Sequence, residues 1–208
     1  MIGVLRLQTG SELLLTDGKG KKANAVIVDD NRKKTVVEIK AIENKDERKP
    51  KIAIGISLIK NSSRFEWFLE KATEIGVSEI IPMICSRTEK EKFRYDRMQN
   101  ILTSAMLQSQ QYWLSVLHQP VDFEKTLELR FEQKFIAHCE QSNKQALSFN
   151  RLNAASQLIL IGPEGDFTHG EIELALKNDF IPVSLGTTRL RTETAGIVAA
   201  VLLKTVIN

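Results

Sequence analysis

The chain has 208 residues, a length that suits one large or two small domains. Its apolar content of 42% supports a buried core, and its net charge of +3 permits a nucleic-acid partner without demanding one. No apolar run approaches the roughly 20 residues that span a bilayer, and the N-terminus lacks a signal-peptide pattern, so we expect a cytoplasmic protein with no membrane partner.

The first part of the chain is predicted to be a small β domain. Short β-prone runs separated by turn signals predict strands that would form a small barrel or sheet. The expected strands are Val4–Leu7, Leu13–Thr16, Ala23–Val28 and Thr35–Ile39. Basic side chains are concentrated here. They fit a surface that contacts RNA phosphates, and they equally fit a sheet edge that lysine protects from pairing.

A polar segment that ends in a proline, Glu43–Pro50, is the expected linker. Beyond it, strands and helices alternate, which predicts a parallel α/β sheet. The expected strands are Ile52–Leu58, Ile80–Cys85, Lys134–His138, Leu158–Ile161 and Ile181–Leu185. The expected helices are Arg64–Ile75, which Gly76 would end, Tyr95–Leu107, Val121–Gln133 and Thr192–Ile207.

Several common site motifs are absent from the sequence. The segment GPEGDF at Gly162–Phe167 matches neither a dinucleotide-binding loop nor a Walker loop. No zinc, calcium or nucleophile-elbow motif is present, so the sequence requires no metal. The isolated cysteines, Cys85 and Cys139, are expected to be reduced and buried, and the three histidines are expected to be structural.

Two glycine-containing loops carry the functional prediction. One begins at Gly162 and the other runs from Gly186 to Thr192. Each follows a short apolar strand and precedes an amphipathic segment, so both are expected at the carboxyl ends of neighbouring parallel strands. Ligands of open α/β sheets bind at that edge, where glycine allows a close backbone approach. Taken singly, each loop fits an ordinary turn equally well.

Taken together, the two loops resemble those of a known family. IGPEGDF at Ile161–Phe167 and SLGTTRLRTETA at Ser184–Ala195 are similar to the IGPEGGF and LGxRILRTETA signatures of the bacterial 16S rRNA uridine-N3 methyltransferases of the RsmE type. KATEIGV at Lys71–Val77 is similar to the family's KATELGV. VLRL at Val4–Leu7, followed by DGKG at Asp17–Gly20, resembles its N-terminal pattern. The motifs are colinear and cover nearly the whole chain.

The resemblance implies the fold of the SPOUT superfamily of S-adenosylmethionine-dependent RNA methyltransferases. Residues 49–208 would form a parallel-sheet α/β domain with a trefoil knot, and residues 1–48 a PUA-like β-barrel that binds RNA and is shorter than in relatives. The knotted loops would hold S-adenosylmethionine. The enzyme would be a homodimer without a metal, and it would methylate N3 of a uridine in 16S rRNA of the small ribosomal subunit.

Candidate site residues follow from the matched motifs and from their position in the loops. The residues expected to line the S-adenosylmethionine pocket, mostly through their backbone, are Ile161, Gly162, Pro163, Gly165, Leu185, Gly186, Leu190, Arg191, Thr192 and Ala195. Arg191, and after it Arg64, are hypothesised to stabilise the uracil anion, and Glu164 or Glu193 to accept its proton. The residues expected to contact RNA are Arg6, Lys19, Lys21, Lys60 and Arg64.

The sequence departs from the family at two informative places. Asp166 stands where the family usually has a second glycine, so its side chain is expected to point away from the cofactor or to tighten the loop. Leu107–Gln111 lies where the family often reads EQSGR. Two alternatives therefore stay open beside the predicted enzyme. One is a SPOUT methyltransferase with another RNA target, and the other is a non-catalytic RNA-binding or ribosome-assembly protein of the same fold.

Overall fold

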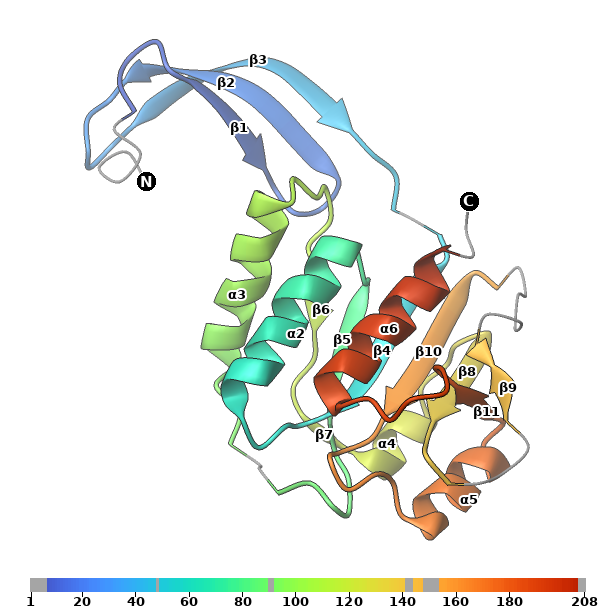
Figure 1. Cartoon of the computed structure of the whole chain (residues 1–208). Helices are drawn as coiled ribbons and strands as arrows, with labels where there is room; N and C mark the ends of the chain where they lie inside the picture. The colour runs from blue at the N-terminus through green and yellow to red at the C-terminus, as the bar shows by residue number, and fades with distance from the viewer. Residues whose placement is uncertain (1–6, 48, 90–91, 141–143, 148–153, 206–208) are drawn as a thin grey trace.

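The computed structural model describes residues 7–47, 49–89, 92–140, 144–147 and 154–205 (Figure 1). The strands are β1 (Glu12–Thr16), β2 (Lys21–Asp29), β3 (Val36–Asn44), β4 (Lys51–Ser57), β5 (Glu79–Ile84), β6 (Val116–Leu117), β7 (Val121–Asp122), β8 (Gln133–Ala137), β9 (Gln145–Ala146), β10 (Ser156–Ile161) and β11 (Ile181–Ser184). The helices are α2 (Ser62–Ile75), α3 (Tyr95–Gln108), α4 (Phe123–Leu127), α5 (His169–Lys177) and α6 (Thr192–Thr205).

The N-terminal part forms an antiparallel sheet of three strands in the order β1-β2-β3. Irregularities in the pairing of β2 with β3, at Asn24/Ala25 and at Ile27/Asp29, accompany a strong bend of this sheet (Figure 1). Three of the expected strands are therefore present. The fourth, Val4–Leu7, falls outside the described residues except for Leu7.

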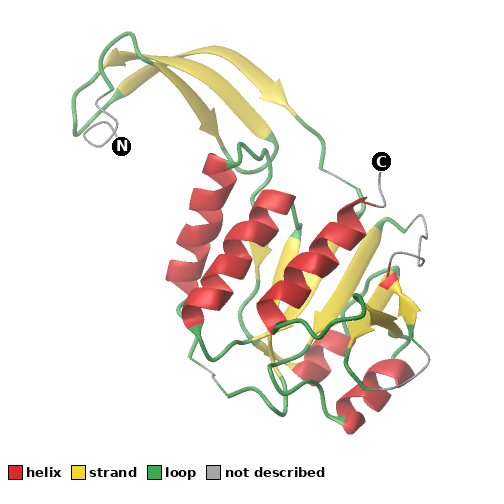
Figure 2. Ribbon diagram, viewed as in Figure 1, coloured by secondary structure: helices red, strands yellow, loops and turns green. Residues whose placement is uncertain are grey.

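The second sheet has eight strands in the order β6-β5-β4-β10-β8-β11-β9, with β7 also paired to β5. Every pairing in it is parallel, which confirms the predicted α/β class. Helices α2, α3 and α6 cover one face, and α4 and α5 lie on the other (Figure 2). The carboxyl ends of all these strands meet at one edge, which we call the carboxyl edge.

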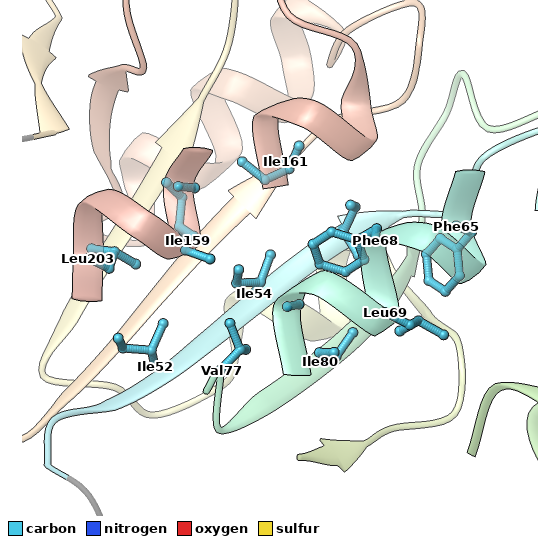
Figure 3. Close-up of a cluster of buried hydrophobic side chains, with 14 of the residues drawn as sticks. Ile52, Ile54, Phe65, Phe68, Leu69, Val77, Ile80, Ile159, Ile161 and Leu203 are labelled. Carbon is cyan, nitrogen blue, oxygen red and sulfur yellow. The ribbon is translucent and has the colours of Figure 1, made fainter. Parts of the chain in front are cut away.

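Both faces of the central strands are buried because the stretches Ile52–Ile56 of β4 and Leu158–Ile161 of β10 hold only apolar residues and one glycine. Ile52 and Ile54 of β4 pack with Ile159 of β10 beneath α2 and α6 (Figure 3). The alternate residues Leu158 and Leu160 point to the opposite side and join the core under α4 and α5. Side chains alternate across a strand, so a continuous apolar run fills both cores.

Local signals set the limits of α2, which starts two residues before the predicted Arg64 and ends at the predicted Gly76. The Asn61 side chain accepts a hydrogen bond from the Ser63 amide at the start of the helix. Gly76 ends it with φ +89°, and its N–H donates to the carbonyls of Ala72 and Thr73.

The predicted helix Val121–Gln133 is wrong. Val121 and Asp122 pair with β5, the helix that follows has only five residues, and Gln133 already belongs to β8. Strand pairing at both ends of this segment overrides its local helical pattern.

The two sheets meet through the β1–β2 turn. The Gly18 carbonyl accepts a hydrogen bond from the Leu114 amide at 2.9 Å, and the Gly20 amide donates to the Tyr112 carbonyl at 2.9 Å. A Cβ added at Gly20, whose φ is +98°, would lie 2.7 Å from both the Trp113 ring and the Lys45 carbonyl, so only glycine fits. The contact places the N-terminal sheet at the amino ends of the large sheet's strands, opposite the carboxyl edge (Figure 1).

Candidate active site

The two loops singled out in the sequence both lie at the carboxyl edge, but their strands are not neighbours. β8 lies between β10 and β11 and pairs with both. The expectation of neighbouring strands was therefore wrong. The reason is that the chain crosses over β8 on its way from β10 to β11. A third loop, which leaves β8 after Ala137, therefore reaches the same edge of the sheet.

The three loops enclose a groove with two lobes, which we call the carboxyl-edge groove. The first lobe has a volume of about 300 Å³ and the second about 340 Å³. Residues of the β10 loop line only the first lobe, whereas Lys144 and the start of the β11 loop line only the second. The residues common to both lobes are Ala137, Cys139, Arg189, Leu190 and Ala195.

The structure brings the expected pocket residues together around this groove, with the exception of Gly165. Those in the first lobe are Ile161, Gly162, Pro163, Arg191 and Thr192. Leu185 and Gly186 line the second lobe, and Leu190 and Ala195 line both. The residues that sequence reasoning missed are Ala137, His138, Cys139 and Lys144, because their positions depend on where β8 inserts.

Gly165 faces Arg87 instead of the groove. The Arg87 Nη1 atom donates to the Gly165 carbonyl at 2.7 Å and lies 3.4 Å from the Phe167 carbonyl. A Cβ added at Gly165 would lie 3.3 Å from Arg87 Cδ, so the glycine leaves room for the arginine. Arg87 therefore fixes the β10 loop from outside. It follows β5 in the sequence, and no local pattern identifies it.

Glu171 fixes the same loop from the other end. Its Oε1 accepts from the Ser86 amide at 2.8 Å, and its Oε2 accepts from the Thr168 amide at 2.7 Å. The Thr168 side chain accepts in return from the Glu171 amide, which completes a capping box at the start of α5. The spacing Thr-x-x-Glu is a sequence signal that would have located this helix start.

The Asp166 side chain tightens the loop, which was one of the two expectations for it. Its Oδ2 accepts a hydrogen bond from the Cys139 amide at 2.7 Å and so ties the β10 loop to the β8 loop. Its Oδ1 accepts from the Phe167 amide at 2.9 Å. The residue has φ +64°, a left-handed conformation in which glycine is the least strained residue.

Substitutions of Asp166 should separate these two effects. Asp166→Ala should lower the free energy of unfolding by about 2 kcal/mol, because the bond to the Cys139 amide is lost and φ remains positive. Asp166→Gly should cost about 1 kcal/mol less than alanine, because glycine adopts this conformation without strain. Urea unfolding measures both values. A glycine variant less stable than the alanine variant would contradict this account.

The proposed catalytic residues fall into two pairs. Arg191 and Glu164 both line the first lobe and are exposed there. Arg64 and Glu193 instead pair with each other beside the groove, with Arg64 Nε 3.6 Å from Glu193 Oε1. The Glu193 carboxylate is buried and lies in the first turn of α6, where the helix dipole favours a negative charge.

The predicted RNA contacts lie at opposite ends of the molecule. Lys60 is near the groove: its amide donates to Glu164 Oε1 at 3.3 Å, and its Nζ lies 2.7 Å from Glu89, which raises the pKa of Lys60. Lys19 and Lys21 lie at the β1–β2 turn by the amino ends of the strands. Arg6 falls outside the described residues.

The two cysteines differ in environment. Cys85 is buried, and burial raises the pKa of its thiol to about 12, so the thiol stays protonated and unreactive. Cys139 is exposed and lines both lobes of the groove. The expectation that both are buried was therefore wrong for Cys139, because the strand ends two residues earlier, at Ala137.

Within the described ranges, no group of three or more His, Cys, Asp or Glu side chains is placed to hold a metal ion. None of the helices in those ranges is both long and apolar enough to cross a membrane.

Two family models match different parts of the chain. A family model described as an RNA methyltransferase domain matches residues 46–204, and one described as an RNA methyltransferase PUA domain matches residues 2–40. The chain is 32% identical to the ribosomal RNA small subunit methyltransferase E of Synechocystis sp., over 94% of this chain and 66% of that protein. It is 31% identical to the protein of that name from Mesomycoplasma hyopneumoniae, over 82% and 76%.

Solved structures agree with the sequence matches. The ribosomal RNA small subunit methyltransferase E of Neisseria gonorrhoeae, solved with S-adenosylmethionine, superposes with a TM-score of 0.86 at 27% identity, over 98% of this chain and 86% of that one. The TrmH/SpoU tRNA modifying enzyme of A. aeolicus has a TM-score of 0.51 at 15% identity, over 76% and 75% of the chains, and shows a likeness of fold alone.

Proposed function

The chain belongs to the ribosomal RNA small subunit methyltransferase E family of RNA methyltransferases, and we propose that it methylates N3 of a uridine in 16S rRNA of the small subunit. The observation that carries the proposal is the carboxyl-edge groove. The IGPEGDF and RLRTETA loops, distant in the sequence, form its walls together with the β8 loop. The chain spans 66% of the length of its Synechocystis relative, so we state the full activity as a proposal and do not transfer it from that relative.

The groove suits S-adenosylmethionine, which when bound supplies an electrophilic methyl group on a sulfonium. Gly186 has φ +146° and nothing within 4 Å of an added Cβ, so its backbone is open to a ligand. Glu164 and Asp166 line the first lobe and carry charge opposite to the sulfonium and ammonium groups. We assign the sulfonium end of the donor to the first lobe and its nucleoside to the second.

For the acceptor, Arg191 and Glu164 take complementary roles. N3 of uridine carries a weakly acidic proton that must leave as the nitrogen attacks. The Arg191 guanidinium would stabilise the negative charge that develops on the uracil oxygens, and Glu164 in the same lobe would accept the proton. Arg64 and Glu193 support the site from beside the groove, since the two charges already face each other.

We further propose that two copies associate through α6. This helix carries only Glu193 and Lys204 as charged residues, and its outer face presents half-buried Val198 and Val201, the latter 40% exposed, with Ile197 at the margin where it also contacts the core. An apolar stripe on the outside of a surface helix marks an interaction surface. Because α6 begins at the groove, a second copy seated on it would lie next to the uridine.

Val201→Lys should make the dimer dissociate at least about 100-fold more readily, because an unpaired charge would be buried in the interface. Sedimentation equilibrium measures the dissociation. Leu176→Lys, at a 43% exposed site on α5, is the matched control and should leave the dimer intact. A wild-type chain that is monomeric at micromolar concentration would refute the assignment of this face.

The domain roles follow from the same proposal. Residues 1–48 would grip RNA and residues 49–208 would hold the donor and carry out the transfer, in the cytoplasm, where small subunits assemble. No metal is expected to take part.

Transfer of tritium from labelled S-adenosylmethionine to small ribosomal subunits tests the activity. Label at N3 of one uridine supports the proposal. Label in another RNA or at another atom points to a different target. No label in any RNA, with donor binding intact, identifies a non-catalytic relative. A matched reaction with protein-free 16S rRNA shows whether the assembled subunit is the substrate.

A further inference from the structure

His138 is a buried histidine whose ring has no hydrogen-bond partner in the part of the chain that the structure describes. It directly follows β8, is 8% exposed and lines the second lobe of the groove. Among the described residues, neither ring nitrogen finds a hydrogen-bond partner. Leaving a buried polar group unpaired is costly, so such groups are normally satisfied by protein, water or ligand.

The rings of the other two histidines each have a carboxylate partner. His118 Nε2 lies 3.0 Å from Glu79 Oε2, and His169 Nδ1 lies 3.1 Å from Glu140 Oε2. Both rings are at the surface, where water could serve equally well. The His138 ring is the most enclosed of the three and yet makes no hydrogen bond to a described residue, which indicates that a bound molecule completes its environment.

The surroundings of His138 keep its ring neutral. Burial lowers the pKa of the imidazole, and the nearby Lys144 ammonium lowers it further, against smaller opposite effects of Asp166 and Glu140. Lys144 is held in place, because its Nζ donates to the carbonyls of His138 at 2.8 Å and Glu140 at 2.6 Å. A neutral imidazole offers one donor and one acceptor.

The same charges decide which part of a donor fits beside the ring. Lys144, which lines only the second lobe, would repel a sulfonium or ammonium group there, whereas Glu164 and Asp166 would attract one in the first lobe. The uncharged base is then left for the second lobe. The edge of adenine pairs an amino donor with ring-nitrogen acceptors, which complements a neutral imidazole.

We propose that His138 recognises the adenine of S-adenosylmethionine through hydrogen bonds in the second lobe and sets the specificity for that base. A rotation of the ring about its broad χ2 torsion would turn a nitrogen toward the lobe and satisfy it. This inference rests on the proposed function only in requiring that the groove binds the donor.

Calorimetry with S-adenosylhomocysteine and S-inosylhomocysteine tests the assignment without any turnover. Hypoxanthine replaces the amino donor of adenine by a carbonyl, so wild-type protein should bind the inosyl compound at least about tenfold more weakly, because a site built around hydrogen bonds rejects a ligand that leaves them unmade. His138→Ala should lose most of this preference. His138→Asn, which keeps one donor and one acceptor, should retain part of it.

The controls separate a failure of the inference from a failure of the function. His118→Ala, which removes a histidine at the amino end of the sheet, should leave the preference unchanged, and thermal unfolding checks that each variant is folded. If wild-type protein binds neither compound, the proposed donor site is wrong. If it binds both and His138→Ala keeps the full preference for adenine, only the role of His138 is overturned.

The pH dependence of binding gives a second readout that a structural role would not produce. Protonation turns the acceptor nitrogen of His138 into a donor. Affinity for S-adenosylhomocysteine should therefore fall as the pH drops below about 6.5, the ordinary histidine pKa, since the pKa of this ring is lowered. The charged groups that face the ring or share its lobe are Lys144, Glu140, Asp166 and Arg189. His138→Asn should remove the part of this loss of affinity that comes from protonation of the imidazole ring. A variant whose affinity depends on pH as that of the wild type does would contradict the proposed role of His138.

Discussion

Replacing Arg191 with alanine is expected to lower the turnover number by about 10²–10³-fold, the effect typical of removing one preorganised donor to a developing anion. Arg191 lines the first lobe beside Glu164, at the start of the last helix. Donor affinity should change little, because the proposed donor site shares that binding among backbone groups of three loops. Single-turnover methylation at saturating donor, with calorimetry for affinity, measures the two effects separately.

The charge and its geometry can be told apart with a second substitution. Arg191→Lys keeps the positive charge but loses the planar fork, so it should recover only part of the rate. Arg130→Ala removes an exposed arginine from the loop before β8, away from the groove, and should leave turnover unchanged. An Arg191→Ala variant with wild-type turnover would exclude Arg191 from catalysis.

Gly196→Val is expected to have the largest effect on stability. A Cβ at Gly196 would lie 2.6 Å from Phe68 Cε2 and 3.1 Å from Ile56 Cδ1, both in the packed core. The helix α6 must then move outward, at a cost of about 3 kcal/mol or more. Because Thr192 and Ala195 at its start line the groove, donor affinity should fall as well. Urea unfolding and calorimetry measure the two losses.

Gly170→Ala in α5 is the matched control. Nothing lies within 4 Å of an added Cβ there, and alanine favours the helix by about 0.5–1 kcal/mol over glycine. The control should therefore be as stable as the wild type or more so. If Gly196→Val unfolds at the wild-type urea midpoint, the close packing of α6 on α2 is not what holds the groove in place.

Local sequence was sufficient for the elements that have their own signals. The apolar runs of β4 and β10 are buried on both sides, and the spacing of apolar residues in α2, with Gly76 after it, gave a helix within two residues of its observed start. The two signature loops came together at one edge because the strands before them are parallel, and parallel strands place their carboxyl ends together.

The parts that sequence could not supply depend on strand order. No sequence pattern near β8 indicates that this strand inserts between β10 and β11, so His138 and Cys139 could not be assigned to the groove. The pairing of Arg64 with Glu193 and the bonds of Arg87 to the β10 loop join residues far apart in the chain. The division at residue 48 and the trefoil knot remain predictions.

The placement of the N-terminal sheet has a consequence for the size of the substrate. β4 has seven residues; at about 3.3 Å per residue it separates the amino and carboxyl edges by about 20 Å. RNA that contacts Lys19 or Lys21 and also enters the groove of the same copy must extend over that length. A short single-stranded oligonucleotide holding one uridine would reach only one of the two places. We therefore expect the protein to select its uridine by the rigid, folded surroundings that hold it at that distance, more than by the bases next to it.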